Sequence, residues 1–342
     1  MAGPADQVAI EAAARLLEQG ALVAFPTETV YGLGADAENP QAVSAIYRAK
    51  GRPSNHPLIV HLAPEADVGY WSGTVGPMAQ QLISAFWPGP LTLILPRAAR
   101  IPDAVAGGQD SVGLRCPAHP VAQALLRSFK GGRGGVAAPS ANRFGQVSPT
   151  LAQHVREEFR DIPEVGCVLD GGQSAVGIES TIIDLSRGHP VMLRPGHVTA
   201  SMIANVIGLM PAQADAAAPR ASGTLASHYA PHTPVAVVPA TELATTLVNL
   251  SQAGRRVALM HHSDVAALAF AVAGAVVLRA ALPPETVGYA HDFYAALRRL
   301  DHAGADVILV EALPHSAPWQ AIADRLQRAA HGSVGVIERL LK

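Results

Sequence analysis

Apolar and polar positions in the first two hundred residues form short blocks that predict strands separated by helices. Leu and Ala recur at helical spacing after Asp6 and stop at Gly20, which predicts a helix ahead of the apolar run at 21–25. A second helix is predicted from Pro40 to Lys50. Further strands are expected at 57–62, 90–96, 112–115, 135–139, 167–170, 180–185 and 191–195. The alternation predicts an α/β domain with a mixed sheet.

The pattern changes near residue 209. Residues 209–234 are rich in Ala, Pro, Ser and Gly and have no apolar period, which predicts a linker between a first domain at 1–208 and a second at 235–342. The second domain is expected to be a small Rossmann-like parallel α/β domain without a glycine-rich nucleotide loop of its own. Its strands are expected at 235–238, 256–260, 274–278 and 306–311, with helices near 241–252, 285–300 and 317–329.

Length and composition narrow the class of protein. A chain of 342 residues and 35.4 kDa favours two domains. The formal net charge of -2 gives no overall attraction for nucleic acid or an anionic membrane, so phosphate binding would need a local cluster of cations. Two cysteines are too few for a disulfide framework or a zinc site, and the sequence shows no leader. We therefore expect a cytoplasmic protein that makes no membrane contact.

Short polar and cationic residues gather at the ends of the strands predicted in the first domain. Loops at strand ends of open α/β sheets bring distant segments together, so these residues are candidates for a ligand site. The four cations are Lys50, Arg52, Arg115 and Arg194, which together could hold a triphosphate or a carboxylate. The other candidates are Thr27, Glu28, Thr29, His56, His61, Ser111, Ser140, Asn142, Glu179, Ser180 and Thr181.

Each candidate also has a purely structural interpretation. An isolated Lys or Arg at a strand end is more often a solvated charge, and His61 in LIVHL would ordinarily be a hydrogen-bonded core histidine. Ser and Asn in PSAN can serve turn chemistry alone. His228 and Tyr229 in the linker suggest docking onto a ligand, although burial against a domain explains them nearly as well. Spacing alone therefore indicates an anion-binding α/β enzyme of unspecified substrate.

Seven motifs, in order, resemble the YrdC-like family of threonylcarbamoyl-AMP synthases. They are PTETVYGLG, KGRPSNHPLIVHL, FWPGPLTLIL, VGLRCP, APSANRFGQVSPT, GIESTIIDL and LRPG, and the linker SGTLASHYAP with the α/β tail resembles the long, two-domain form. The resemblance implies a YrdC-like domain with a twisted mixed sheet and a concave basic cavity. It also implies a nucleotidyltransferase that makes L-threonylcarbamoyladenylate and pyrophosphate from L-threonine, bicarbonate or CO2 and ATP. A separate transferase complex would pass the threonylcarbamoyl group to the adenosine beside the tRNA anticodon.

The same resemblance implies roles for individual residues. Threonine would be held by Thr29, His61, Arg115 and Ser180, with Arg115 as the partner of its carboxylate. ATP would be contacted by Lys50, Arg52, His56, Ser111, Ser140, Asn142, Ser148, Arg194 and Tyr229, and Lys50 and Arg52 would be catalytic. A Mg2+ ion is expected with ATP, held mostly by phosphate oxygens and water, so no protein metal ligand is named. The position of His56 is often Asn in relatives, and the usual Pro-Gly step of the linker is Ser222-Gly223 here.

Two rival functions and one residue remain to be weighed. Carbamoyltransferases of hydrogenase maturation or antibiotic tailoring carry further modules for which this chain has neither the length nor the cysteines. An RNA-binding module is disfavoured by the net charge of -2 and the few aromatics on the candidate loops, which leaves open a weak RNA contact by an enzyme. Glu28 is expected to orient a cation such as Lys50 or Arg52, with a surface carboxylate nearly as plausible.

Overall fold

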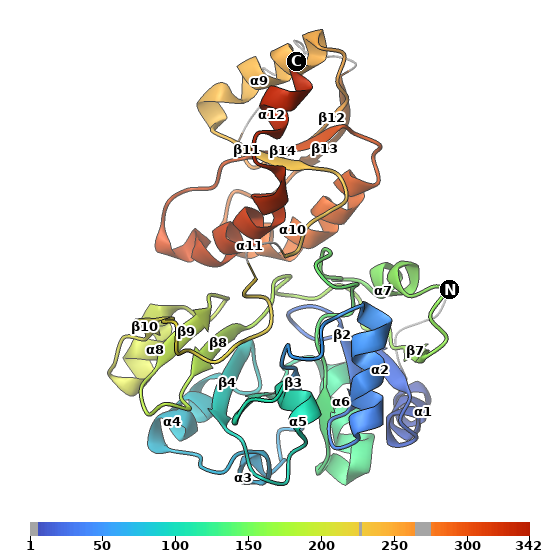
Figure 1. Cartoon of the computed structure of the whole chain (residues 1–342), viewed down its shortest axis with the longest axis vertical. Helices are drawn as coiled ribbons and strands as arrows, with labels where there is room; N and C mark the ends of the chain where they lie inside the picture. Colours follow the sequence, from blue (N-terminus) through green and yellow to red (C-terminus); the bar gives the residue numbers. More distant parts are fainter. Residues whose placement is uncertain (1–5, 226–227, 264–274) are drawn as a thin grey trace. The chain divides into compact units, whose positions relative to one another are not determined.

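The protein is described by a computed structural model that covers residues 6–225, 228–263 and 275–342 (Figure 1). The chain divides into two compact units. Unit 1 comprises residues 1–144 and 148–224, and unit 2 comprises residues 145–147 and 225–342. The segment predicted as a linker is therefore divided at residue 224. Residues 226 and 227 of that segment, and residue 274 of a predicted strand, lie outside the described residues.

The helices of unit 1 begin and end where capping residues occur in the sequence. Asp6 accepts a hydrogen bond from the backbone N–H of Ala9, and Asn39 caps the second helix in the same way. Gly51, in the left-handed conformation, ends that helix at Lys50. The helical segments are α1 (Gln7–Glu18), α2 (Pro40–Lys50), α3 (Val68–Trp71), α4 (Pro77–Phe86), α5 (Asp103–Ala106), α6 (Pro120–Ser128), η1 (Phe129–Gly132), α7 (Ala152–Glu158) and α8 (Ala200–Ile207).

A ten-stranded mixed sheet forms the centre of unit 1, with the order β10-β9-β8-β4-β5-β3-β6-β2-β1-β7. Its strands are β1 (Leu22–Phe25), β2 (Gly32–Asp36), β3 (Ile59–Leu62), β4 (Leu91–Pro96), β5 (Ser111–Arg115), β6 (Gly135–Ala137), β7 (Val165–Val168), β8 (Thr181–Asp184), β9 (Val191–Arg194) and β10 (Ala212–Gln213). The pairs β3–β5 and β4–β8 are parallel, whereas β1–β2 and β4–β5 are antiparallel. The mixed sheet expected from the sequence is confirmed.

Strand β2 was not expected from the sequence. The GLG of PTETVYGLG begins this strand, and Gly32 pairs with Phe25 of β1. A Cβ on Gly34 would lie 2.7 Å from Val136 Cγ1 and 2.9 Å from Phe25 Cε1, so only glycine allows the strands to pack this closely. The stretch PTETVY is thus the connection between two antiparallel strands. The second strand shows no apolar alternation in the sequence because two of its residues are glycines.

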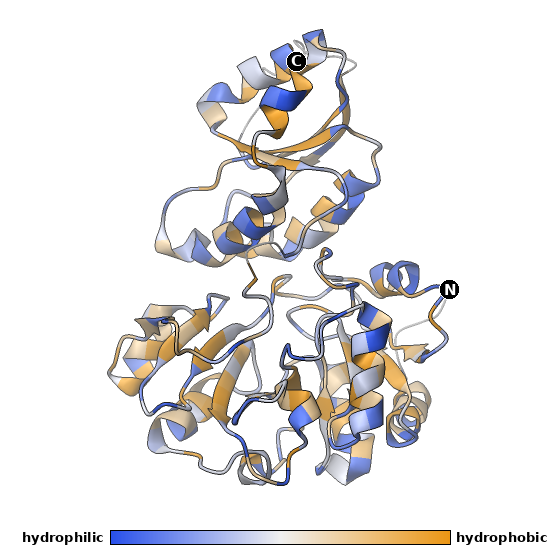
Figure 2. Cartoon of the chain, viewed as in Figure 1, coloured by the Kyte–Doolittle hydropathy of each residue, from blue (hydrophilic) through white to orange (hydrophobic). Residues whose placement is uncertain are grey.

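The two faces of this sheet have different cores. Helices α2, α4 and α8 pack on one face, which includes Leu93 and Ile183. Helices α1 and α6 pack on the other face against Val23 and Phe25 of β1. Farther along that second face, β9, β8, β4, β5 and β3 lie side by side, and we call this region the inner face. Its apolar residues are Ile59, Ile94, Ile182, Val191 and Leu193, which pack with Ala221. Figure 2 shows hydrophobic colouring on strands of this sheet, among them β4 and β8.

Unit 2 is a small α/β unit whose four strands are all parallel, in the order β11-β14-β12-β13. The strands are β11 (Val235–Val238), β12 (Val257–His261), β13 (Val276–Ala281) and β14 (Val307–Glu311). The helical segments are α9 (Ala240–Gln252), α10 (Thr286–Asp301), η3 (Ala317–Trp319), α11 (Gln320–Ala330), η4 (His331–Ser333) and α12 (Val336–Leu340). The parallel α/β architecture expected for this region is confirmed. Within the described ranges, no helix combines the length and the apolar character needed to cross a membrane.

Candidate active site

The residues assigned to threonine gather at one end of the inner face. Strands β3 and β5 are parallel and in register, with His61 opposite Arg115. Arg115 Nη1 donates a hydrogen bond of 2.8 Å to Thr29 Oγ1, in the segment that follows β1. Arg115 Nε also donates to Gly89 O at 3.3 Å, and the next carbonyl, that of Pro90, accepts from the residue after Ser180. Five segments distant in sequence therefore meet here.

Glu28 orients a cation, as expected, but the cation is Arg115 and neither of the two named from the sequence. Glu28 Oε1 lies 2.6 Å from Arg115 Nη2, and Glu28 Oε2 accepts a 3.0 Å hydrogen bond from Ala118 N. The side chains of Arg115 and Glu28 are only 5% and 9% exposed. Glu28 is therefore neither a surface carboxylate nor the partner of Lys50 or Arg52. Its interactions hold a buried guanidinium in place at the end of β5.

His61 is a buried, neutral imidazole. Burial, together with the positive charge of Arg115, lowers the pKa of His61 to about 3. Its Nδ1 lies 3.3 Å from Ile59 O, and Phe25 packs edge-on against the ring with 6.0 Å between the centroids. The core-histidine interpretation and the ligand interpretation are both compatible with this position. At neutral pH, His61 can offer a hydrogen bond but no charge.

Lys50 joins the end of α2 to the turn after β6. Its ammonium donates to Ser140 O at 2.6 Å and also to Asn142 O. The side chain is buried, and burial with the adjacent Arg52 holds the pKa of Lys50 well below its usual value. Phe144 packs near this turn, with its ring centroid 5.8 Å from the guanidinium carbon of Arg52 and 5.4 Å from the ring of His56. The structure thus brings together the residues of the motifs KGRPSNH and PSAN.

Arg194 connects residues assigned to ATP with residues assigned to threonine. At the end of β9, its Nε and Nη2 donate to Ser180 O at 3.0 Å and Ser180 Oγ at 3.2 Å, and its Nη1 donates to Ser222 O at 2.8 Å. Ser111, at the start of β5, lines a small hollow of the inner face together with Ser222. Ser148 Oγ donates to Glu179 Oε1 at 2.5 Å, one residue before Ser180. Arg194, assigned to ATP, and Ser180, assigned to threonine, are therefore in direct contact in unit 1.

Tyr229 belongs to unit 2, whereas every other predicted site residue belongs to unit 1. It is buried, with a positive φ of 60°, a backbone conformation that non-glycine residues seldom adopt. Its ring lies 5.7 Å from that of Tyr294 and 4.2 Å from that of His228, and the guanidinium of Arg325 lies 5.7 Å from it. A role for Tyr229 over the nucleotide stays a prediction.

Two buried hydroxyl groups at this site received no specific role from the sequence, although Thr27 was among the candidates. Thr92 Oγ1 lies 2.8 Å from Ser180 Oγ, and Thr27 Oγ1 lies 2.9 Å from Thr29 Oγ1. A signal for Thr92 was present, because it is the one polar residue in the strand LTLIL, whose flanking leucines face the opposite core. Thr27 carried no comparable signal beyond its place at a strand end.

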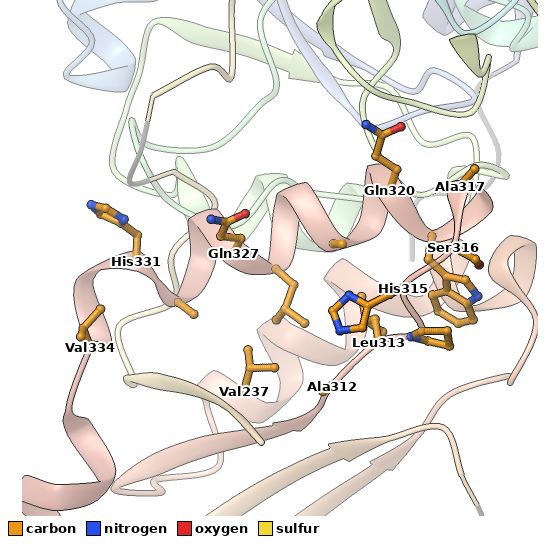
Figure 3. Close-up of a pocket in the computed structure, with 15 residues that line it drawn as sticks. Val237, Ala312, Leu313, His315, Ser316, Ala317, Gln320, Gln327, His331 and Val334 are labelled. Atoms are coloured by element: carbon orange, nitrogen blue, oxygen red, sulfur yellow. The ribbon is translucent and has the colours of Figure 1, made fainter. Parts of the chain in front are cut away.

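A roomy cavity lies in unit 2 (Figure 3). It has a volume of about 740 Å³ and lies between Val237 of β11, the loop after β14 and α11. Its walls include Leu313, Trp319 and Leu326, and its polar lining includes Gln320 and Gln327. None of the described residues that line it is Lys, Arg, Asp or Glu. This cavity therefore lacks the cations that a triphosphate or a carboxylate needs.

Comparisons with known proteins agree with the motifs. The family model Sua5_yciO_yrdC, described as "Telomere recombination", matches residues 15–196, and the model Sua5_C, described as "Threonylcarbamoyl-AMP synthase, C-terminal domain", matches residues 198–331. The threonylcarbamoyl-AMP synthase of Pyrococcus abyssi is 37% identical over 334 residues, 94% of either chain. That of Bacillus subtilis is 40% identical over 335 residues, covering 95% of this chain and 94% of the relative.

A solved structure extends the match to the fold. The crystal structure of P. abyssi Sua5 complexed with L-threonine aligns with a TM-score of 0.85 and 35% identity, covering 95% of both chains. Sequence and fold are thus similar over both units. The chain belongs to the two-domain family of Sua5-type threonylcarbamoyl-AMP synthases.

Proposed function

We propose that this chain makes L-threonylcarbamoyladenylate and pyrophosphate from L-threonine, bicarbonate or CO2 and ATP. This is the first step of threonylcarbamoyladenosine modification of tRNA next to the anticodon. Besides the family, the observation that supports it is the direct contact between residues of the two assigned sets in unit 1. Arg115 with Thr29 provides a place for an amino acid, and Arg194, assigned to ATP, donates hydrogen bonds to Ser180, assigned to threonine.

The chemistry requires two anions to meet. The threonine amine adds to CO2, which forms an N–C bond and releases a proton, and one oxygen of the resulting carbamate attacks the α-phosphorus of ATP. A P–O bond forms, the bond to the β-phosphate breaks, and pyrophosphate leaves. Because the carbamate oxygen is a weak nucleophile, alignment and charge neutralisation are the main means of catalysis. Intramolecular positioning of this kind can lower a barrier by roughly 7–11 kcal/mol.

The residues of this chain would divide that work. Arg115 would bind the threonine carboxylate through guanidinium N–H groups, and the neutral His61 would add a hydrogen bond without repelling or attracting the anions. Arg194 and Arg52 would face the phosphates. Lys50 donates to two backbone carbonyls, so we assign it a role in holding the turn at 140–142 as well as the catalytic role implied by the family.

A Mg2+ ion would accompany ATP. The described part of the chain contains no group of three or more His, Cys, Asp or Glu side chains suited to a metal ion. This donor set fits an ion held mainly by phosphate oxygens and water. The ion would supply positive charge to the triphosphate, while Arg52 and Arg194 would supply the fixed charges of the protein.

The product is a mixed anhydride of a carbamic acid and AMP, which is an activated acyl donor. We propose that a separate transferase complex uses it to acylate the amine of the adenosine in tRNA. On this account the synthase itself needs only a weak RNA contact or none.

Pyrophosphate release tests the proposed function. The full chain, incubated with ATP, Mg2+ and bicarbonate, should release pyrophosphate when L-threonine is added and clearly less when L-serine is added. Threonine carries a methyl group that can contact the pocket wall, which discriminates modestly between the two amino acids. Omitting bicarbonate from degassed buffer provides the matched control. Pyrophosphate release at the same rate without threonine would overturn the proposal.

A further inference from the structure

The hydroxyl groups of Thr27 and Thr29 have a fixed direction of hydrogen bonding. Thr27 Oγ1 donates its single proton to Val30 O at 2.6 Å. The 2.9 Å contact between the two hydroxyl oxygens must therefore use the proton of Thr29, and Thr27 must be the acceptor. The backbone N–H groups of Thr29 and Val30 also lie 3.2 Å from Thr27 Oγ1, so three donors share its two lone pairs, and the hydroxyl contact at 2.9 Å is the shortest of the three.

Thr29 is consequently left with one free acceptor position and no free donor. Its oxygen already accepts from Arg115 Nη1 at 2.8 Å, and its proton is directed to Thr27. A hydroxyl group has one proton and two lone pairs, so one lone pair of Thr29 remains. That lone pair can accept an N–H or O–H of a ligand, but the hydroxyl cannot donate to a carboxylate.

Arg115 is held in a complementary way. Three of its five N–H groups donate to Gly89 O, Thr29 Oγ1 and Glu28 Oε1, which leaves two for a ligand. The second carboxylate oxygen of Glu28 is fixed by Ala118 N, so Glu28 cannot swing away from the guanidinium. Both side chains are buried, and a buried ion pair offsets the cost of desolvation only when its hydrogen-bond geometry is good.

We propose that Glu28 and Thr27 are positioning residues that set the polarity of the threonine subsite, with Arg115 as the donor to the carboxylate and Thr29 as the acceptor from the substrate nitrogen. This inference rests on the proposed function and assigns residues to which the family resemblance gave no role. Neither positioning residue touches the substrate. Glu28 acts through Arg115, and Thr27 acts through Thr29.

The reaction gives this polarity a specific consequence. The amine of threonine has N–H groups before carboxylation, and the carbamate R–NH–COO⁻ retains one N–H afterwards. Thr29 can therefore hold the same nitrogen before and after the carbamate forms. N-methyl-L-threonine has an N–H as the amine but none as the carbamate. It should therefore be a poor substrate even though its amine can be carboxylated.

The Thr27 arm of the test measures turnover. Wild type should use threonine at least about tenfold better than N-methyl-L-threonine, as judged by kcat/KM for pyrophosphate release, since one hydrogen bond to a polar group is lost. In Thr27→Val the proton of Thr29 is no longer committed, so discrimination between the two substrates should fall to about half or less of the wild-type ratio. Thr27→Ser keeps the hydroxyl and should restore the wild-type ratio. Steric exclusion of the methyl group alone would leave all three ratios equal and would overturn the assignment.

The Glu28 arm measures binding by calorimetry. In Glu28→Gln, one of the two carboxylate positions becomes an NH2 group that faces either Arg115 or the N–H of Ala118. The Kd for threonine should rise at least about tenfold, the Kd for ATP should stay within about twofold, and threonine methyl ester should lose less affinity than threonine. Glu65→Gln is the matched control, because Glu65 also pairs with an arginine, Arg127, but is exposed.

The two arms can fail independently of the proposed function. Equal weakening of threonine and ATP binding in Glu28→Gln would show a merely structural residue and would overturn its positioning role. If Glu28→Gln does not fold, Glu28→Asp keeps the charge one methylene farther from Arg115, and the same selective loss is expected. A wild type that binds threonine but releases no threonine-dependent pyrophosphate would refute the proposed function, while the calorimetric arm would still decide the inference.

Discussion

The inner face of unit 1 and the cavity of unit 2 differ in charge far more than in burial. In unit 1, Arg115, Lys50 and Arg194 are buried cations, and each donates hydrogen bonds to defined oxygens. In unit 2, a volume of about 740 Å³ is lined by apolar and neutral polar side chains (Figure 3). An anion site is thus marked by converging, oriented donors rather than by the volume of a cavity.

The difference also has an energetic meaning. Burial of a cation opposes folding, and a paired cation offsets that cost only if its geometry is good. Arg115 has the Glu28 carboxylate, whereas Lys50 has two carbonyl oxygens. A structure that needed only stability would gain as much from apolar residues. The anions of the proposed reaction would explain why these cations are buried in unit 1.

The largest expected effect is that of Arg115→Ala. It should lower kcat/KM for threonine by on the order of 10²–10³, with a smaller effect on the KM for ATP, because a buried charge that binds the carboxylate is lost. Unfolding should also become easier by about 3–5 kcal/mol, because Glu28 is left buried without its partner. Steady-state kinetics and urea unfolding measure the two effects. Arg127→Ala, which removes an exposed ion pair with Glu65, is the control and should change neither. A larger effect on ATP than on threonine would mean that the two subsites are exchanged.

Lys50→Met should come next in size. The turn at 140–142 loses the ammonium that binds its carbonyls, so the KM for ATP should rise by about tenfold while the KM for threonine changes little. Initial rates at varied ATP and threonine separate the two. Lys130→Met removes a partly exposed lysine that pairs with Asp36 and Glu38, and it should leave both constants unchanged. Unchanged ATP kinetics in Lys50→Met would remove Lys50 from the nucleotide side of the site.

His61 should make unit 1 sensitive to acid. Its folded pKa of about 3 lies below the ordinary value of 6.5, so the unfolded state binds more protons between these pH values. Stability is therefore lost as pH falls through this window, by about 1.4 kcal/mol per pH unit for this one group. The difference in unfolding free energy between wild type and His61→Phe should be flat above pH 7 and slope between pH 6 and pH 4. A flat difference for His61→Phe would contradict a buried, neutral imidazole.

The smallest effect is expected in unit 2. Gln320→Ala combined with Gln327→Ala removes two polar side chains that line its cavity, and threonine-dependent turnover should stay within about twofold of wild type. The same assay as for Arg115→Ala measures it. A loss comparable to that of Arg115→Ala would break the contrast between the charged inner face and the neutral cavity.

Much of the architecture could be predicted because periodicity and capping residues act locally. Asp6, Asn39 and Gly51 fix helix ends by interactions within a few residues, and the strand runs retain their apolar pattern. Strand β2 was not predicted because Gly32 and Gly34 carry no side chain and so give no alternation of apolar and polar residues. The need for glycine there arises from contact with Val136, which lies about a hundred residues away in sequence.

The candidate site was predictable by residue type but not by pairing. The motifs indicated Arg115 as a ligand of a carboxylate, yet nothing local to Glu28 indicates that its partner lies 87 residues downstream. The pair forms because the connection after β1 reaches the end of β5, although β3, β6 and β2 lie between the two strands in the sheet. The proton direction of Thr27 and Thr29 likewise depends on coordinates, because it follows from which oxygen lies near Val30 O.

The most direct test of the account is isotopic. The full chain should be incubated with ATP, Mg2+, ¹³C-bicarbonate and ¹⁵N-L-threonine, and the nucleotides separated promptly for mass spectrometry. The account predicts one adenylate that carries both labels, formed in proportion to pyrophosphate, and almost none of it in Arg115→Ala. Pyrophosphate release without a doubly labelled adenylate, or an adenylate that carries the nitrogen label without the carbon label, would contradict the central claim.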